Sequence, residues 1–215
     1  MSPKETYAAV AARPRWFGVL AITLVIAAAC QYIIFSSLGM QDAMVDQATR
    51  NPNVTDQQID TIERFISILP YVISGATLIL GPLISAAISG ILLLIFSTLM
   101  GGTATFKQVF AIGAHSGVVS SLSGMISAGL ILLGAEPSGT TPPGTNLGIF
   151  VPMLEETSFI TSVLSSIDLI LVWWILSLSI GLGVLYKRRT GGIATSLICV
   201  YVVIALIIGF VRSGS

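Results

Sequence analysis

The sequence predicts an all-α fold, a polytopic membrane helical bundle with about five transmembrane helices. Of its 215 residues, 54% are hydrophobic and only 9% are charged, and the mean hydropathy is +0.93. A soluble domain carries about a quarter charged residues, so this composition indicates a bilayer. Several uncharged runs also approach the roughly 20 residues that a helix needs to cross the hydrocarbon core. We expect residues 1–215 to form a single membrane domain.

Five segments meet or nearly meet this length. They are residues 16–38, 71–99, 108–134, 164–186 and 193–211. The first segment also has features of a secretory signal, because Arg13 and Arg15 precede it and a run of small residues ends at Cys30. Its apolar sequence continues through Phe35, however, which gives a full crossing and favours an uncleaved helix.

The uncharged run between Arg64 and Lys107 is long enough for two crossings. Acidic residues cluster before Tyr71, whereas Lys107 follows the run, and ends on opposite sides of a membrane require an odd number of crossings. We therefore expect one long span with a kink at Gly81-Pro82, since proline removes a backbone donor and clashes with the preceding turn. Neighbouring helices can absorb such a defect within a membrane.

The distribution of basic residues predicts the orientation of the chain. Seven of the ten basic residues lie on alternating connections of the predicted bundle, namely Lys4, Arg13, Arg15, Lys107, Lys187, Arg188 and Arg189. Most acidic residues fall on the opposite side. By the positive-inside rule, the N-terminus is cytoplasmic and the C-terminus lies outside.

Two longer connections, residues 39–70 and 135–163, are the predicted external loops. We expect the first to be a helical hairpin, because Thr55-x-x-Gln58 has the form of a capping box and apolar residues follow it at helical spacing. The second contains a segment rich in proline and glycine, residues 137–144, which excludes regular structure.

The sequence contains no recognisable catalytic, cofactor-binding or metal-binding motif. The formal net charge is zero, which gives no indication of a nucleic-acid partner. One histidine and one acidic residue within the predicted spans are too few for most hydrolytic, metal-dependent or covalent mechanisms. We therefore expect a protein that is not an enzyme and that needs no cofactor.

Asp168 and His115 are the polar residues of greatest interest, because ionisable side chains within a membrane are costly and usually face the protein interior or water. Asp168 lies roughly 28 Å from Lys187 along a helix and His115 about 12 Å from Lys107, so the two differ in depth. We favour a structural role for Asp168, such as helix capping or hydrogen bonding to Ser and Thr. Transport is the alternative. For His115 we favour a hydrogen bond to a neighbouring helix.

Small residues and tryptophans mark candidate helix contacts. Gly113-x-x-x-Gly117 has the small-xxx-small form that permits close approach of two backbones, either within the bundle, which we favour, or against a partner membrane protein. Trp173 and Trp174 lie in the middle of a predicted span, so we expect at least one of them to fill a contact between helices.

The order of these features resembles the Yip1-domain family of five-span membrane proteins. The resemblance rests on short segments in a fixed order: Pro14-Arg15-Trp16, Gly81-Pro82, Gly101-Gly102, Phe106-Lys107-Gln108-Val109, Ala114-His115-Ser116, Asp168-Leu169 and Trp173-Trp174. The chain is most similar to the short bacterial branch, which implies the bacterial cytoplasmic membrane. It lacks the long polar N-terminal region of eukaryotic members, which argues against the GTPase binding associated with them.

The resemblance implies a membrane-organisation factor or an accessory partner of an export transporter. Our first hypothesis is therefore a non-enzymatic membrane protein that acts through the lipid bilayer, through other membrane proteins or through self-association. The alternative is a small transporter or channel, because the break at Gly81-Pro82 is of a kind that marks transport sites.

Overall fold

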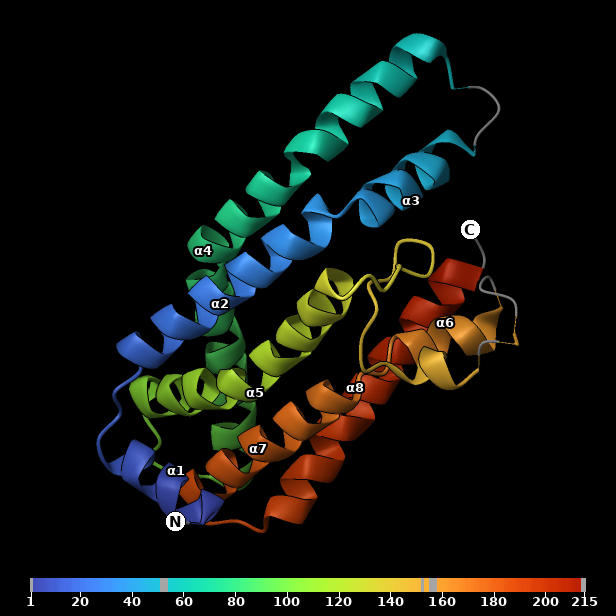
Figure 1. Cartoon of the computed structure of the whole chain (residues 1–215). Helices are drawn as coiled ribbons and strands as arrows, with labels where there is room; N and C mark the ends of the chain where they lie inside the picture. The colour runs from blue at the N-terminus through green and yellow to red at the C-terminus, as the bar shows by residue number, and fades with distance from the viewer. Residues whose placement is uncertain (1, 51–53, 152, 155–157, 214–215) are drawn as a thin grey trace.

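The structure is a computed structural model that describes residues 2–50, 54–151, 153–154 and 158–213. Its architecture is a bundle of long helices (Figure 1). They are α1 (Pro3–Ala12), α2 (Phe17–Ser36), α3 (Leu38–Thr49), α4 (Asp56–Met100), α5 (Phe106–Leu132), α6 (Phe159–Ser165), α7 (Leu169–Leu185) and α8 (Thr190–Ser213), with a short 3-10 helix at Leu147–Phe150. The predicted all-α membrane bundle is confirmed.

Four of these helices are long and apolar enough to cross a membrane. They are α2, α4, α5 and α8, and the remaining apolar helix, α7, has 17 residues. A helix of that length is about 25 Å long, which is close to the thickness of the hydrocarbon core. Many large apolar side chains of α4 and α8 are exposed, as expected for helices that face lipid.

Contacts at glycine positions fix the directions of the first three long helices. A Cβ atom at Gly117 would lie 3.9 Å from Thr23, and one at Gly124 would lie 3.5 Å from Cys30. The residue numbers of the paired positions increase together along α2 and α5, so these two helices run in the same direction. α4 runs the opposite way, because its early residue Tyr71 contacts the late α2 residue Tyr32.

The last two long helices continue this alternation. Asp168, at the beginning of α7, lies beside Ser123 in the second half of α5, whereas Gly181 near the end of α7 faces Ile112 in the first half. Tyr201 of α8 contacts Asp168, so α8 reverses direction again. The five helices α2, α4, α5, α7 and α8 therefore alternate in direction, as successive membrane crossings do.

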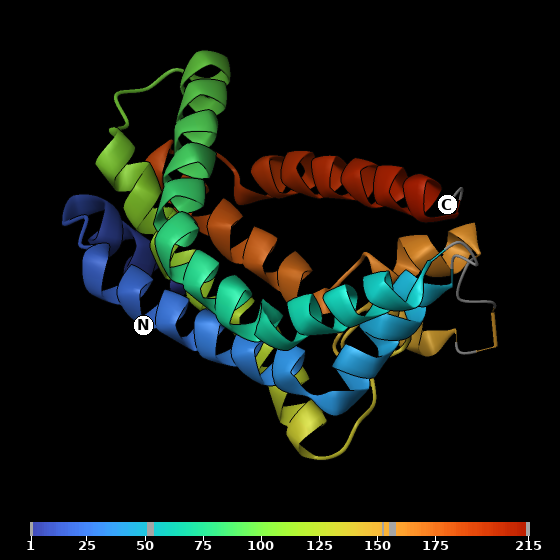
Figure 2. The same ribbon diagram turned by 90° about the horizontal axis from the view of Figure 1, so that it is seen from above.

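The helical hairpin predicted within residues 39–70 is present. It consists of α3 and the first part of α4, which project together from one end of the bundle (Figures 1 and 2). Thr55 begins α4 through the predicted capping box, with its N–H 2.9 Å from Oε1 of Gln58. Ile66 of the return arm is buried, and Met40 of α3 is buried in a cluster with Ile34 of α2 and Ala128 of α5.

α4 is a single helix of 45 residues that contains Pro70 and Pro82. The return arm of the hairpin and the predicted second span, residues 71–99, therefore form one continuous helix. Its two parts run in different directions, with the bend near the middle of the helix (Figures 1 and 2). A kink is the expected effect of a proline inside a helix.

Residues 164–186 do not form one helix, which corrects the predicted fourth span. α6 ends at Ser165 and α7 begins at Leu169. The break occurs because Asp168 adopts an extended conformation (φ −99°, ψ 129°) and caps α7. The preceding loop has no regular helix between residues 133 and 146, as its proline and glycine content predicted.

Candidate functional site

Asp168 caps the N-terminus of α7. Its Oδ1 atom accepts hydrogen bonds from the backbone N–H groups of Ile170 at 2.7 Å and Leu171 at 3.1 Å. The first N–H groups of a helix have no partner within the helix, and a carboxylate there also interacts favourably with the positive end of the helix dipole. Asp168 therefore satisfies two N–H groups that the beginning of α7 would otherwise leave without a partner.

The same carboxylate joins α7 to α5 and to the preceding loop. Ser123 of α5 donates its hydroxyl hydrogen to Oδ2 at 2.7 Å, and Thr145 of the loop donates to Oδ1 at 2.9 Å. Backbone bonds run beside these side chains, from Leu169 N–H to the Thr145 carbonyl at 3.1 Å and from Leu147 N–H to the Ile167 carbonyl at 2.8 Å.

α8 contributes Tyr201 to this arrangement, which we call the Asp168 cluster: Asp168, Ser123, Thr145, Ser166 and Tyr201. The Tyr201 hydroxyl accepts a hydrogen bond from the Asp168 N–H at 2.9 Å and donates one to the Ser166 carbonyl at 3.0 Å. Both carboxylate oxygens thus already accept hydrogen bonds. The geometry is suited to fastening four segments together, and no substrate-sized space is needed to explain it.

The sequence did not identify three members of this cluster. Ser123, Thr145 and Tyr201 are 45, 23 and 33 residues from Asp168 in the chain. A hydroxyl residue in an apolar helix is too common to indicate a partner at such separations. The helix cap at Asp168 could be predicted from the sequence, because an Asp directly before an apolar helical run is a recognised signal for the beginning of a helix.

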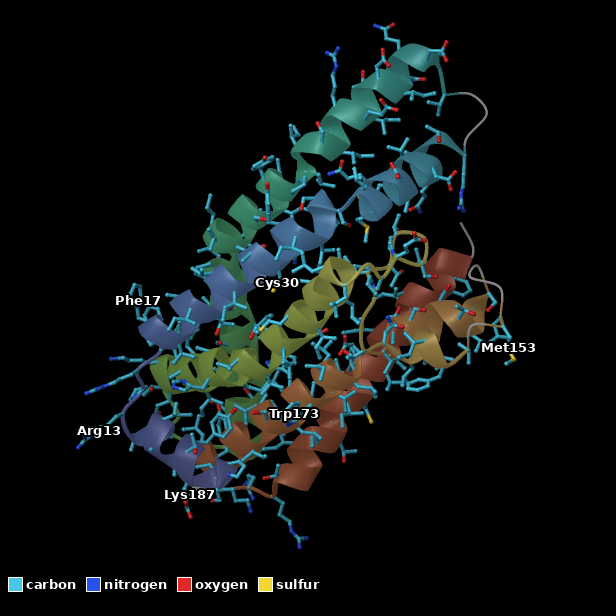
Figure 3. The ribbon with its side chains drawn as sticks, in the orientation of Figure 1. Arg13, Phe17, Cys30, Met153, Trp173 and Lys187 are labelled. Atoms are coloured by element: carbon cyan, nitrogen blue, oxygen red, sulfur yellow. The ribbon has the colours of Figure 1, made fainter. Side chains whose placement is uncertain are left out.

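The other candidate residues lie apart from this cluster. His115 is half-buried on α5, and its Nδ1 lies 2.7 Å from the Ala111 carbonyl of the same helix. It is eight residues from Ser123, or about 12 Å along the helix axis. Trp174 packs against the main apolar core, whereas Trp173 is 52% exposed (Figure 3).

The glycine candidates face other helices of the chain. A Cβ atom at Gly113 would lie 3.4 Å from Ser89 of α4, and Gly117 faces Thr23 of α2. Gly81 faces Leu24 of α2, where an added Cβ would lie 2.5 Å from a methyl carbon. Gly81 precedes Pro82, so the close approach of α4 to α2 lies beside one of the two prolines of that helix.

α1 packs across the end of the bundle opposite the Asp168 cluster, and this helix was not predicted from the sequence. Tyr7 of α1 is buried, and its hydroxyl lies 2.7 Å from the hydroxyl of Ser177 on α7. Burial raises the pKa of Tyr7 above its ordinary value. The signal for α1 was present, because Ser2 and Glu5 form a capping box around Pro3.

Most basic side chains gather at the end of the bundle that carries α1. Figure 3 shows Arg13 and Lys187 at this end and Met153 at the other. Lys107 lies in the first turn of α5, close to α1, because Gln108 donates a hydrogen bond to the Ala11 carbonyl at 3.1 Å. The seven basic residues singled out by the sequence are all exposed.

A cavity of about 640 Å³, lined by both polar and apolar residues, lies at the opposite end, between α3, the α5–α6 loop and α6. Asp46, Arg50 and Glu136 are among its lining residues. Arg50 pairs with Asp46 at 3.1 Å, and both side chains are well exposed. In the described part of the chain, no group of three or more His, Cys, Asp or Glu residues is placed to hold a metal ion.

Comparison with known proteins identifies the family. A family model for the Yip1 domain matches residues 1–212. No curated protein and no solved structure gave a match. The match spans the cluster, the hairpin and all five alternating helices, so this chain is an integral membrane protein that belongs to the Yip1 domain family.

Proposed function

We propose that this chain is a non-enzymatic protein that acts by binding other membrane proteins, as a membrane-organisation factor or as an accessory subunit of an export transporter. The bacterial cytoplasmic membrane is its proposed location, with five crossings and a cytoplasmic N-terminus. The alternating helix directions and the gathering of basic residues at the α1 end support this topology.

The hairpin of α3 and α4 is the observation that carries the proposal. At 1.5 Å per residue, the 45 residues of α4 measure about 68 Å along the helix axis, roughly twice the thickness of the hydrocarbon core. The first part of α4 carries four charged residues within nine positions, Asp56, Asp60, Glu63 and Arg64. This part therefore belongs outside the hydrocarbon.

Two apolar side chains of this arm lack a neighbour that covers them. Phe65 is 56% exposed and Ile68 is 51% exposed, whereas Ile66 between them is buried. An apolar surface on a helix that lies beyond the hydrocarbon gains free energy when a partner removes it from water. We therefore assign the partner contact to the Phe65 and Ile68 side of the hairpin.

The polar interior supports a role without catalysis. Both oxygens of the Asp168 carboxylate accept hydrogen bonds from the protein, which gives this side chain a structural role between α5, α7 and the loop. His115 is directed to a carbonyl of its own helix. No nucleophile and base pair follows from these contacts.

Site-specific photocrosslinking in native membranes tests the proposal. A photoreactive amino acid at position 65 is expected to crosslink to a discrete membrane protein that mass spectrometry can identify. Ile79 provides the matched control, because it is also exposed on α4, at 71%, but lies within the apolar part of the helix. Equal crosslinking from both positions, or recovery of lipid alone from position 65, would contradict the proposal.

A small transporter or channel is the second candidate, and the bend of α4 at Gly81-Pro82 favours it. The roughly 12 Å between His115 and Ser123, the α5 partner of Asp168, argues against a direct relay between the two ionisable groups. The test is solute or ion flux into vesicles that contain the purified chain. Flux that falls in Asp168→Asn or His115→Ala would support this candidate.

A further inference from the structure

Four aromatic rings cluster where α2 and α5 begin, at the α1 end of the bundle. Trp16 packs edge-on against Phe17 and Phe110, with ring centroids 5.8 Å and 4.9 Å apart. Phe106 stacks on Phe110 at 5.6 Å. Phe17 is 73% exposed. Aromatic side chains, tryptophan above all, gather at the level of the lipid headgroups, so this cluster marks that level on the bundle.

Three basic residues lie close to this aromatic cluster in the chain or on the neighbouring end of α1. Arg15 directly precedes Trp16, Lys107 directly follows Phe106, and Arg13 lies at the end of α1. The hydrogen bond from Gln108 to the Ala11 carbonyl holds the end of α1 beside the first turn of α5. Arg13 and Phe17 project outward from the same edge of the bundle (Figure 3).

None of these three cations forms an ion pair with a described residue. Arg13, Arg15 and Lys107 are all exposed, and within the described residues no carboxylate lies at ion-pair distance from any of them. By contrast, Arg50 at the other end of the bundle pairs with Asp46. The α1 end therefore presents unneutralised positive charge at the depth where lipid phosphates lie.

We propose that Arg13, Arg15 and Lys107 form a binding surface for the headgroups of anionic phospholipids. Guanidinium groups donate paired hydrogen bonds to phosphate oxygens, and a lysine adds a point charge. Basic residues next to a membrane span attract anionic lipids, and the effect grows with each added charge. This inference goes beyond the partner-binding role proposed above and does not depend on it.

The aromatic cluster favours lipid over an acidic protein segment as the occupant. The rings fix the depth of the basic side chains beside the headgroup layer, where phosphates are present at high local concentration. Exposed Phe17 adds an apolar surface on the hydrocarbon side of the cations, which a lipid chain covers and a soluble acidic peptide does not. The surface thus offers a polar and an apolar contact in the order in which a phospholipid presents them.

Fluorescence quenching of Trp16 tests the proposal. The chain has three tryptophans, so Trp173→Phe with Trp174→Phe leaves Trp16 as the single reporter. The protein is reconstituted in vesicles of brominated phosphatidylglycerol or brominated phosphatidylcholine mixed with their unbrominated forms. We expect the anionic lipid to associate with Trp16 roughly fivefold or more strongly than the zwitterionic lipid at low salt.

Charge variants provide the decisive comparison. Arg13→Gln with Arg15→Gln and Lys107→Gln should reduce the preference to near unity, whereas Arg50→Gln with Arg64→Gln, at the other end, should retain it. Native mass spectrometry of the chain with all three tryptophans, titrated with each lipid, provides a second readout that does not require the tryptophan substitutions. Equal association of the two lipids, or an equal loss in both sets of variants, would overturn the proposal.

Discussion

The hydroxyl of Ser123 lies 2.7 Å from Oδ2 of Asp168, which joins the middle of α5 to the first turn of α7. The other oxygen of the same carboxylate caps α7 and accepts a hydrogen bond from Thr145. One side chain thus fixes the beginning of a helix, the position of a loop and a contact between two long helices.

Removal of the Asp168 carboxylate is expected to destabilise the bundle. Asp168→Ala deprives two backbone N–H groups and two hydroxyls of their acceptor, so we expect a loss of about 1–3 kcal/mol in the free energy of unfolding. Asp168→Asn retains an acceptor for the cap and should lose less. Thermal unfolding in detergent measures both, and a Tm for Asp168→Ala equal to that of the unchanged chain would contradict the structural role.

The close approach of α4 to α2 at Gly81 predicts a steric effect. Gly81→Ala places a Cβ 2.5 Å from a methyl carbon of Leu24, so the end of that side chain must shift, and we expect a loss of about 1 kcal/mol relative to Gly75→Ala. Leu24→Ala in the same chain should reduce that loss. Gly75→Ala is the matched control, since nothing lies within 4 Å of its Cβ and alanine favours a helix by about 1 kcal/mol. Stability measured for all four chains tests the contact; equal effects at positions 81 and 75 would argue against it.

Tyr7 predicts a dependence of stability on alkaline pH. Burial raises its pKa in the folded chain, so the unfolded chain releases the phenol proton first, near the ordinary value of about 10. Above that pH the folded state binds more protons, and stability therefore falls as the pH rises toward the folded pKa. Tyr7→Phe should lose about 1 kcal/mol with the hydrogen bond to Ser177 and should also weaken this dependence. Tm values at pH 8 and pH 11 for both chains measure the difference, and an identical alkaline fall in both would exclude Tyr7 as its source.

Trp173 and Trp174 should differ strongly although they are adjacent. Trp174 packs against the main core, so Trp174→Ala is expected to cost about 3–5 kcal/mol through the cavity that it leaves. About half of the Trp173 side chain is exposed, so Trp173→Ala should lower the free energy of unfolding much less. Chemical unfolding in mixed micelles compares them; the reverse order would mean that the packing of α7 is wrong.

The proposed topology, with five crossings and a cytoplasmic N-terminus, predicts the accessibility of the two ends. In a chain whose native Cys30 and Cys199 are replaced by alanine, Lys187→Cys should be shielded from a membrane-impermeant maleimide in intact cells. Thr140→Cys, in the loop at the other end, should react. Both should react after permeabilisation. Labelling of both positions from the same side would contradict the crossing of α7.

Local features of the sequence were sufficient for much of the fold. Uncharged runs revealed the long helices, the Thr55 capping box marked the beginning of α4, and the Gly81-Pro82 pair indicated its bend, because each signal depends on residues close together in the chain. The continuous helix through Tyr71 was not recognised, since a change from charged to apolar sequence marks a change of environment and not the end of a helix. The break before Asp168 was also missed, because the apolar run continues on both sides of it.

The sequence by itself determined that this chain enters a membrane and belongs to the Yip1 domain family, because apolar composition and the order of short motifs are properties of the linear chain. Only the tertiary structure decided that Ser123, Thr145 and Tyr201 surround Asp168, that Gly81 faces Leu24, and that α1 holds its basic end beside Lys107. The physical reason is that these contacts join residues far apart in the chain. The chain contains many serines, glycines and tyrosines that look alike in the sequence, and only the packing of whole helices determines which of them make these contacts.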